Sequence, residues 1–499
     1  MTPILSEYKY KPLTSGKHRT IDDFYEEAHS HEPGKYIQRL GYLVIFASLG
    51  LANTGDSAEI GSMGFLLANQ DFRDEVVQGK DGIVASATYF GMLFGGLCCG
   101  PVCDRMGRRN ILVGGLALNA TAGILMAFTS TPYELILCRF LLGLGIGMIV
   151  TCLLALTSEH APSKSRGTYL NFVSSFWTIG AIWVAVLAYE MFGHGRETSW
   201  RIYCLVNAIP SATAFLLVLC FVPESARYLG LNGKYKEATK VVNNIAGSLG
   251  YVGDKMSEEE LKAQFPPAKT YDEGFWATVK QSCKAYGNLF ANSSTRSRTM
   301  VVQGLWFFTS FGTGTSLWIP RILSELVNDP YLFSLLYACG SVPGILLAGF
   351  LLDKMERTRL LTIGFALTTC TLACLAVVAA SGTNSQIAIL ILVCLFHSCL
   401  CLLWSTLSII SAETFPTEIR STAMGVCSAT GRFAFVVVHN ISPILVGTPP
   451  YLVALGSVAF GVGLIFSHFS QLPSQTGAPL KDVEAPLLAN EHKMPLPRQ

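Results

Sequence analysis

Long apolar stretches follow one another along the chain from residue 41 to residue 470, and polar connections separate them. Each stretch is roughly 20 residues long and carries few or no charges, which is what an α-helix needs to cross a bilayer. The pattern therefore predicts an all-α protein held in a lipid bilayer. We place twelve membrane-spanning helices at residues 41–67, 83–103, 111–129, 135–157, 168–189, 202–222, 300–320, 331–352, 360–380, 387–412, 421–446 and 451–470.

Polar segments divide these spans into two sets of six. In the first polar segment, residues 20–28 begin like a capped helix, because Thr20 can cap it and Asp23 stands at its third position. The long middle segment carries helical patches at 235–246 and 257–265. We expect an N-terminal tail, a six-helix bundle, a central loop, a second six-helix bundle and a C-terminal tail at residues 1–40, 41–222, 223–299, 300–471 and 472–499.

Composition agrees with a membrane protein. Only 14% of the residues are charged, against roughly 25% in soluble domains. A net charge of +2 argues against a nucleic-acid-binding protein, whose basic surface would raise the total. Nearly all of the fifteen cysteines fall in or beside apolar runs, so we interpret them as small buried side chains rather than a disulfide framework.

Basic residues are distributed unevenly between the two sides of the predicted membrane. If the N-terminus is cytosolic, most of the 36 lysines and arginines lie in cytosolic segments. By the positive-inside rule, both termini and the central loop are expected in the cytosol. The opposite side carries only Arg73, Lys80, Arg196, Arg201 and Arg321.

The first span contains two acids that are unusual in a membrane. Asp56 and Glu59 are the only charges between residues 41 and 67, and their spacing places them on one helical face. An ionised acid at a helix centre costs roughly 3 kcal/mol, so such residues are expected to line a cavity rather than face lipid. Two alternatives remain: Asp56 lies near the outer membrane surface, or both acids only pair with basic partners.

Two arginines also lie within predicted spans. Arg139 shares a face of the fourth span with Gly143 and Gly147, where small residues let another helix approach closely. Arg432 is in the eleventh span. We expect Arg139 and Arg432 to form charge-compensated pairs with the two first-span acids across a cavity.

The two halves of the chain repeat a pattern after corresponding spans. Gly100-x-x-x-Asp104 follows the second span, and Gly349-x-x-x-Asp353 follows the eighth. Glu159 with Arg166 follows the fourth span, and Glu413 with Arg420 follows the tenth in the same register. A six-plus-six parallel repeat with a long central loop is a plan of secondary transporters.

The residues of the connection after the second span, Gly-Pro-Val-Cys-Asp-Arg-Met-Gly-Arg-Arg at 100–109, resemble the signature of the major facilitator superfamily. Within it, the motifs at 56–59, 176–180, 200–210, 223–228, 413–420 and 427–432 are most similar to the branch of synaptic vesicle 2-related proteins and organic-ion and nicotinate carriers. The resemblance implies the twelve-helix fold in two six-helix halves and a small-molecule carrier.

In this superfamily, certain spans face the substrate cavity, which implies that their aromatic residues stack on a solute. Packing within the core or against lipid remains the alternative for each of them. The aromatic residues expected in the substrate site on this basis are Tyr89, Trp177, Trp306 and Trp404.

The same resemblance implies a gate on the cytosolic side. Asp104 is expected to meet the N-terminus of the eleventh span, and the basic residues after it to pair with acids such as Glu159. These contacts would close the cytosolic side and break in the inward-open state. The residues expected to act in this gate are Gly100, Asp104, Arg105, Gly107, Arg108, Arg109, Glu159, Arg166, Asp353, Glu413 and Arg420.

We therefore expect a secondary transporter of small organic ions, proton-coupled and monomeric, in the plasma membrane or an intracellular vesicle membrane. In one mechanism Asp56 or Glu59 carries the coupling proton; in another, one acid binds a cationic solute or Arg432 binds a carboxylate. Two further hypotheses are a non-transporting membrane binding protein of this fold and a sugar or phosphate carrier. No phosphate-binding loop for ATP is present, and we expect no enzyme activity, cofactor or metal.

Overall fold

The computed structural model describes residues 19–30, 38–193, 198–265, 287, 289–290, 293–352, 354–381, 385–415 and 417–469. Within these ranges the chain forms helices and no strands. Eight segments are long and apolar enough to cross a membrane, and four further helices (α2, α4, α14 and α20) have 24 to 31 residues. The prediction of a twelve-span, all-α membrane protein is confirmed.

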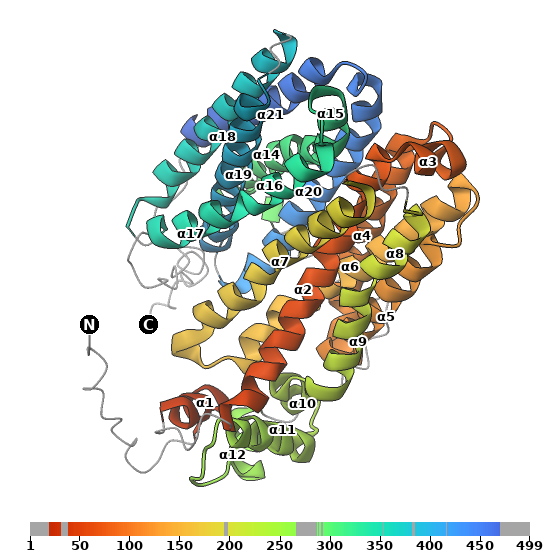
Figure 1. Cartoon of the computed structure of the whole chain (residues 1–499). Coiled ribbons are helices and arrows are strands. Elements are labelled where there is room, and N and C mark those ends of the chain that lie inside the picture. Colours follow the sequence, from red (N-terminus) through yellow and green to blue (C-terminus); the bar gives the residue numbers. More distant parts are fainter. Residues whose placement is uncertain are drawn as a thin grey trace, which may run out of the picture.

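Two groups of helices lie side by side (Figure 1). We call the segment from α2 to α9 the first half and the segment from α14 to α21 the second half. The first half contains α2 (Gln38–Ala68), α3 (Gln70–Phe72), η1 (Arg73–Val77), α4 (Asp81–Met106), α5 (Arg108–Met126), α6 (Pro132–His160), η2 (Ser163–Ser165), α7 (Arg166–Phe192), α8 (Trp200–Asn207) and α9 (Ile209–Phe221).

The second half contains the remaining spanning helices. They are α14 (Ser293–Ser316), α15 (Ile319–Leu326), α16 (Pro330–Cys339), α17 (Ser341–Leu351), α18 (Arg357–Ala380), α19 (Gln386–Thr414), α20 (Thr417–Leu445) and α21 (Pro449–Phe469). Four short helices lie together at one end of the first half (Figure 1): α1 (Ile21–Ser30), α10 (Ala226–Leu231), α11 (Tyr235–Ser248) and α12 (Glu258–Gln264). We call this the α11 end and the opposite end, which carries α3 and α15, the α3 end.

Three predicted spans are divided into two helices each. The predicted span 202–222 consists of α8 and α9, and 331–352 consists of α16 and α17. The predicted span 300–320 takes in α14 up to Ser316 and the start of α15 at Ile319. Pro320 and Pro210 stand in the first turns of α15 and α9. Proline is tolerated there because N–H groups in a first turn have no partner within the helix, whereas inside a continuous helix it would remove a hydrogen bond.

Glycines bring α4 and α6 close together. A side-chain carbon on Gly147 of α6 would lie 2.6 Å from the main-chain oxygen of Met92, and one on Gly95 of α4 would overlap the main chain at Leu144. This is the face of α6 for which the sequence predicts a close helix approach. The first half is therefore tightly packed along α4 and α6.

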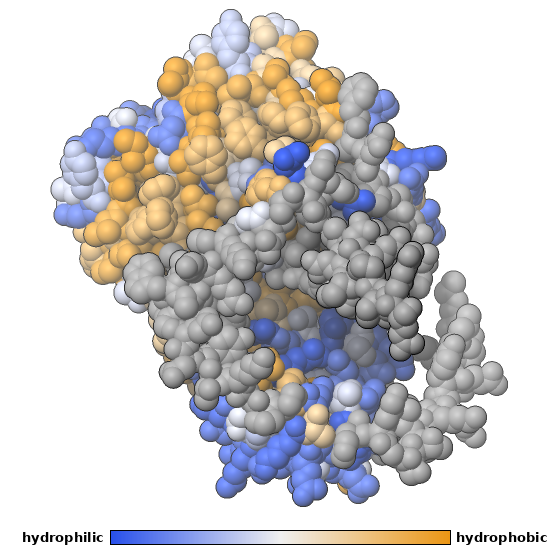
Figure 2. Space-filling model, turned by 180° about the vertical axis from the view of Figure 1, so that it is seen from behind, coloured by the Kyte–Doolittle hydropathy of each residue, from blue (hydrophilic) through white to orange (hydrophobic). Residues whose placement is uncertain are grey.

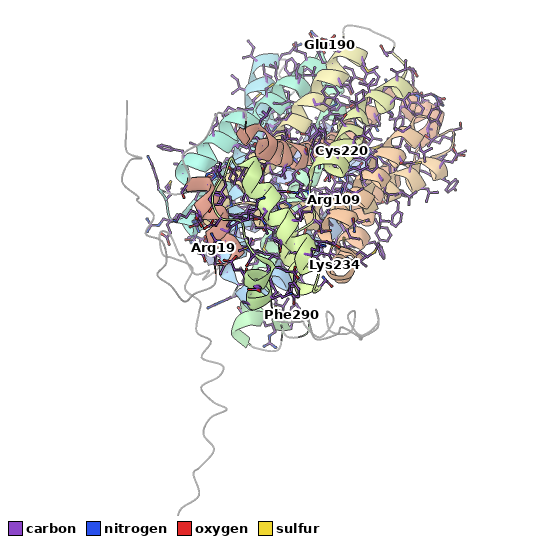
Figure 3. All side chains as sticks on the ribbon, turned by 90° about the horizontal axis from the view of Figure 1, so that it is seen from below. Arg19, Arg109, Glu190, Cys220, Lys234 and Phe290 are labelled. Carbon is purple, nitrogen blue, oxygen red and sulfur yellow. The ribbon has the colours of Figure 1, made fainter. Side chains whose placement is uncertain are left out.

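The surface divides into an apolar body and a polar end. Figure 2 shows hydrophobic side chains gathered over the upper part of the molecule and hydrophilic ones at the α11 end. Viewed from that end, Arg19 lies beside α1 and Lys234 at the start of α11 (Figure 3). An apolar body with a polar end fits a protein that is held in a bilayer and exposes the α11 end to water.

Candidate functional site

The two first-span acids are buried inside the first half. Asp56 is 0% exposed and Glu59 is 1% exposed, one turn apart on α2. The amide of Asn119 on α5 donates a hydrogen bond of 2.9 Å to Asp56 Oδ1, and Asp56 Oδ2 has no partner. This differs from the predicted position beside an open cavity, because neighbouring helices of the same half cover both carboxylates.

Arg139 on α6 is also completely buried and lies against the same turn of α2. Its Nη1 donates to the main-chain oxygen of Glu59 at 2.9 Å, and its Nε lies 3.1 Å from Met63 Sδ. Arg139 Nη2 and Glu59 Oε1 have no hydrogen-bond partner. The arginine therefore stands beside Glu59 and interacts with its charge without a direct bond to the carboxylate.

Glycine positions let the neighbouring helices reach the acids. A side-chain carbon on Gly123 of α5 would lie 2.7 Å from Glu59 Oε1, and one on Gly55 would lie 2.4 Å from the hydroxyl of Ser211 on α9. Asn207 of α8 is also buried and interacts electrostatically with Glu59. Four neighbouring elements of the first half thus enclose the acid pair, which remains partly unpartnered in a low-dielectric interior.

Three members of this polar group were not predicted from the sequence: Asn119, Asn207 and Ser211. Each is a completely buried polar side chain in an otherwise apolar helix. That is the signal that could have found them, since polar groups within a membrane core need partners. We call Asp56, Glu59, Asn119, Arg139 and Asn207 the acid network.

Arg432 lies in the second half and does not join the acid network. Its Nη1 donates to the main-chain oxygen and hydroxyl of Ser428 on its own helix, and its Nε is buried without a partner. No acidic side chain pairs with it among the described residues. The prediction that both arginines pair with the first-span acids is wrong for Arg432, because its helix belongs to the other half.

Two predicted aromatic residues meet near Arg432. The rings of Trp306 on α14 and Trp404 on α19 lie 5.5 Å apart in an edge-to-face arrangement. Each indole N–H is fixed by a hydroxyl, Ser411 for Trp306 and Thr313 for Trp404. The Trp306 ring also lies against Gly431, the residue before Arg432. The second half therefore gathers two half-buried indoles and one half-buried cation whose Nε is buried.

Tyr89 occupies a different place, at the junction of the halves. Its ring on α4 stacks on Phe435 of α20 at 4.5 Å and lies 4.9 Å from the ring of His439. Trp318 donates a hydrogen bond of 3.2 Å to His439 from the start of α15. Trp177 on α7 is 41% exposed and makes no described contact with this group. Trp306 and Trp404 thus contact each other, whereas Tyr89 contacts α20 from the first half.

The two halves are joined most closely near the α3 end. Arg321 of α15 forms an ion pair of 2.8 Å with Asp81 at the start of α4. It is the one ion pair between the halves among the residues that the structure describes. A small pocket near this end, lined by residues such as Ile319, Leu372 and Phe396, is apolar and lies within the second half. We place the candidate site on the charged groups rather than on this pocket.

Gly107 separates α4 from α5 at the α11 end and has a φ of 92°, which favours glycine. A side-chain carbon there would lie 2.3 Å from the Glu224 carboxylate. That carboxylate accepts the main-chain N–H of Arg109 at 3.1 and 3.2 Å, and so caps the first turn of α5. The Arg109 side chain donates to the main-chain oxygens of Val222 and Leu219 at 2.6 Å.

Matching ion pairs occur at this end in both halves. Arg108 pairs with Glu159 in the first half, and Arg357 pairs with Glu413 in the second. The first pair has the partners that the sequence analysis expected, and the second involves an arginine that it did not assign to the gate. The backbones of Gly100, Asp104, Arg105 and Arg420 are helical, but their side chains, like Asp353, lie outside the described residues.

Arg166 pairs with a residue outside the expected gate. It forms an ion pair of 3.0 Å with Asp22 of α1, and Arg227 reaches the same carboxylate at 2.6 Å. The predicted capped helix is confirmed, since Thr20 and Asp23 exchange side-chain to main-chain hydrogen bonds. The apolar face of α1 packs on α11, so α1 is fastened beneath the first half.

Glu26 of α1 reaches the η2 turn in the same region. It accepts hydrogen bonds from the Ser163 hydroxyl and the main-chain N–H of Lys164, and it pairs with the Lys164 ammonium at 3.0 Å. Burial acts to raise the pKa of Glu26, but these bonds and the Lys164 charge outweigh it. The pKa therefore lies below its ordinary value of 4.5.

Comparison with known proteins assigns this chain to a family. The family model described as "Sugar (and other) transporter" matches residues 43–486. Synaptic vesicle glycoprotein 2A of Rattus norvegicus is 22% identical, over 88% of this chain and 78% of the relative. Human synaptic vesicle glycoprotein 2A is 26% identical over 58% of this chain and 42% of the relative.

Solved structures share the fold. The inward-open conformation of the xylose transporter XylE from E. coli has a TM-score of 0.68 at 18% identity, covering 89% of this chain and 99% of that chain. A crystal structure of the D-xylose-proton symporter has a TM-score of 0.66 at 19% identity, covering 87% and 98%. At these identities the likeness shows that this chain shares their fold.

Proposed function

Since this chain belongs to the sugar (and other) transporter family of the major facilitator superfamily, we propose that it is a proton-coupled carrier of small organic ions. It works by alternating access, with residues 41–222 and 300–471 as the two units that rock against each other. Its transport is secondary and needs no enzymatic step. The names of its relatives refer to transport of xylose with protons and to synaptic vesicles, and neither fixes the solute of this chain.

The acid network is the observation that carries the proton assignment. Asp56 is completely buried and has one bonded and one unpartnered carboxylate oxygen. A carboxylate in such a place is stable either when it is protonated or when a positive charge stands beside it. Glu59 has Arg139 beside it, whereas Asp56 has only the Asn119 amide. We assign the exchanging proton to this pair of acids.

The second half supports an organic anion as the solute. Arg432 presents a half-buried guanidinium whose buried Nε has no partner, next to Trp306. A guanidinium binds carboxylate well, and the paired indoles offer an apolar and aromatic surface. The first-half acids are 0% and 1% exposed among helices of one half, which makes them less suited to bind a cationic solute.

The α11 end faces the cytosol in this proposal, because most basic residues of the connecting segments lie there. The Asp81–Arg321 pair and the Tyr89 stack then close the outer side, and the structure represents an inward-facing state. The ion pairs Arg108–Glu159 and Arg357–Glu413 hold the inner ends of each half as rigid units during rocking. The membrane is a vesicle membrane or the plasma membrane.

A substrate panel on the full chain in liposomes tests the proposal. Labelled organic anions, organic cations and sugars are offered with an inward proton gradient, and accumulation is compared with liposomes lacking a gradient. We expect a carboxylate-bearing solute to accumulate with the gradient and to lose binding in Arg432→Gln. Gradient-driven uptake of sugars alone would replace the organic-ion assignment by a sugar carrier, and a silent panel with folded protein would favour a non-transporting binding protein.

A further inference from the structure

Three thiols from two helices meet inside the first half. Cys99 and Cys103 are one helical turn apart on α4 and point to the same side, and Cys152 comes from α6. Cys103 Sγ lies 3.3 Å from Cys99 Sγ and 2.9 Å from Cys152 Sγ. All three sulfur atoms lie within 4.8 Å of one another, and all three residues are buried. We call these residues the thiol cluster.

The separations of the sulfur atoms suit a single metal ion. A bond of roughly 2.3 Å between a soft metal and a thiolate places the sulfurs of a three-coordinate site roughly 4 Å apart. The thiol cluster spans this separation, from 2.9 Å to at most 4.8 Å. Small rotations of the side chains would therefore equalise the three distances without moving either helix.

The backbone beneath the thiol cluster is held in place by the glycine packing of α4 and α6. Gly95 stands one turn before Cys99, and Gly147 stands five residues before Cys152. A side-chain carbon on Gly147 would meet the main chain of α4 at Met92 and Gly95. The two helices cannot separate here without losing this contact, so the three ligand atoms are positioned in advance.

The kind of ligand selects the kind of ion. Among the described residues, no histidine or carboxylate completes the cluster, and the Thr151 hydroxyl lies 3.9 Å from Cys152 Sγ. Zinc in structural sites takes four ligands, whereas thiolate-only sites of lower coordination suit soft Cu(I).

Cys103 is the most exposed member of the thiol cluster. Cys103 is 8% exposed and lies in the last turn of α4, next to Asp104 and close to the α11 end. In the proposed orientation this end faces a reducing compartment, which keeps thiols free to bind metal. Binding replaces S–H bonds by metal–sulfur bonds and releases the protons to water, so that no oxidant or reductant is consumed.

We propose that Cys99, Cys103 and Cys152 form a three-coordinate binding site for Cu(I) that ties α4 to α6. The site is separate from the acid network and does not depend on the transported solute. A bound ion would hold the last turns of α4, which contain Asp104, against α6. The ion thus stabilises the inner end of the first half.

A competition titration tests this site. The full chain, purified anaerobically in detergent, is titrated with Cu(I) against a chromogenic Cu(I) chelator, and X-ray absorption reports the ligands. We expect one bound Cu(I) per chain with a sulfur-only shell, and a loss of affinity of at least about tenfold in Cys103→Ser and Cys152→Ser. Thermal unfolding of the metal-free variants, compared with the metal-free parent, verifies that they fold.

A matched control is available on α18. Cys370 and Cys374 have the same spacing as Cys99 and Cys103 but are both exposed, so the double variant Cys370→Ser/Cys374→Ser should retain the bound ion. Undiminished Cu(I) binding in Cys103→Ser would overturn the proposal. A Cys103–Cys152 disulfide in protein isolated with its thiols trapped at lysis would overturn it as well.

Discussion

Arg139 Nη1 donates a hydrogen bond of 2.9 Å to the main-chain oxygen of Glu59, not to the Glu59 carboxylate. The same oxygen accepts the hydroxyl of Ser62 at 2.8 Å. The arginine thus holds this turn of α2 in place and leaves one carboxylate oxygen of Glu59 without a bonded partner. A carboxylate so placed can gain or lose a proton while the helix that carries it remains fixed.

Removing the arginine should therefore affect more than charge. Arg139→Met deprives the Glu59 main-chain oxygen of a buried charged donor and removes the neighbouring charge, which we expect to destabilise the protein by about 3 kcal/mol or more. Arg139→Lys keeps the charge but lacks the geometry of the guanidinium, so its stability should lie between that of Arg139→Met and that of the parent. Thermal unfolding in detergent measures both. Equal stability of Arg139→Met and the parent would contradict the assigned contact.

Asn119 should matter because it donates the one recorded hydrogen bond to Asp56. Asn119→Ala leaves a buried carboxylate without a donor, and we expect a destabilisation of about 1 to 3 kcal/mol together with weaker transport. Asn110→Ala is a matched control on the same helix, since Asn110 is exposed and bonds only to Met106 of the preceding turn. Its effect should stay within about 0.5 kcal/mol.

Gly107 should not tolerate a side chain. Gly107→Ala places a carbon against Glu224 at a positive φ, and we expect a loss of roughly 1 to 2 kcal/mol and reduced transport. Gly96→Ala, within α4 and with no atom in contact range, should instead be neutral or stabilising by up to about 1 kcal/mol. Unfolding midpoints of both variants provide the test. The same sign for both would contradict this account of the turn.

The Asp81–Arg321 pair should bias the protein towards closure at the α3 end. Asp81→Asn removes an interaction of about 1 kcal/mol and should shift the populations roughly fivefold towards opening at that end. Distances between spin labels on α3 and α15 report the shift. The charge exchange Asp81→Arg/Arg321→Asp should restore closure, and Glu75→Gln, which breaks a pair within the first half, should leave it unchanged.

Docking of α1 should depend on pH through Glu26. Because its pKa is lowered in the folded state, its contribution is complete above the ordinary value of 4.5 and is lost as the pH falls below it. Hydrogen exchange of α1 should accelerate as the pH falls from about 5 to 3, after correction for intrinsic rates, and Glu26→Gln should weaken this dependence. An unchanged profile in Glu26→Gln would show that other groups control the docking.

The sequence predicted the fold well because membrane spans are long apolar segments whose pattern is local. The capped helix at Thr20 and the Arg108–Glu159 pair were also predicted, since capping is local and the pair joins two neighbouring connections. The breaks at Pro210 and Pro320 were not predicted, because both segments remain apolar across the break.

The candidate site was less predictable because it depends on tertiary contacts. The spacing of Asp56 and Glu59 indicated a shared face, but it could not indicate that the face lies within the first half instead of a cavity. The partners of Arg109 and Arg166, which are Glu224 and Asp22, come from distant segments. Arg432 lacked its predicted acid because helical position alone does not give the distance between two halves.

The most direct test of the proposed carrier is the proton movement that accompanies its solute. Liposomes containing the full chain and an internal pH indicator receive an accepted solute from the panel, without an imposed gradient. We expect acidification with the parent and with the exposed-acid control Glu325→Gln, and none with Asp56→Asn/Glu59→Gln, which should still exchange labelled for unlabelled solute. Acidification that persists in the double variant would contradict the assignment of the coupling proton to these acids.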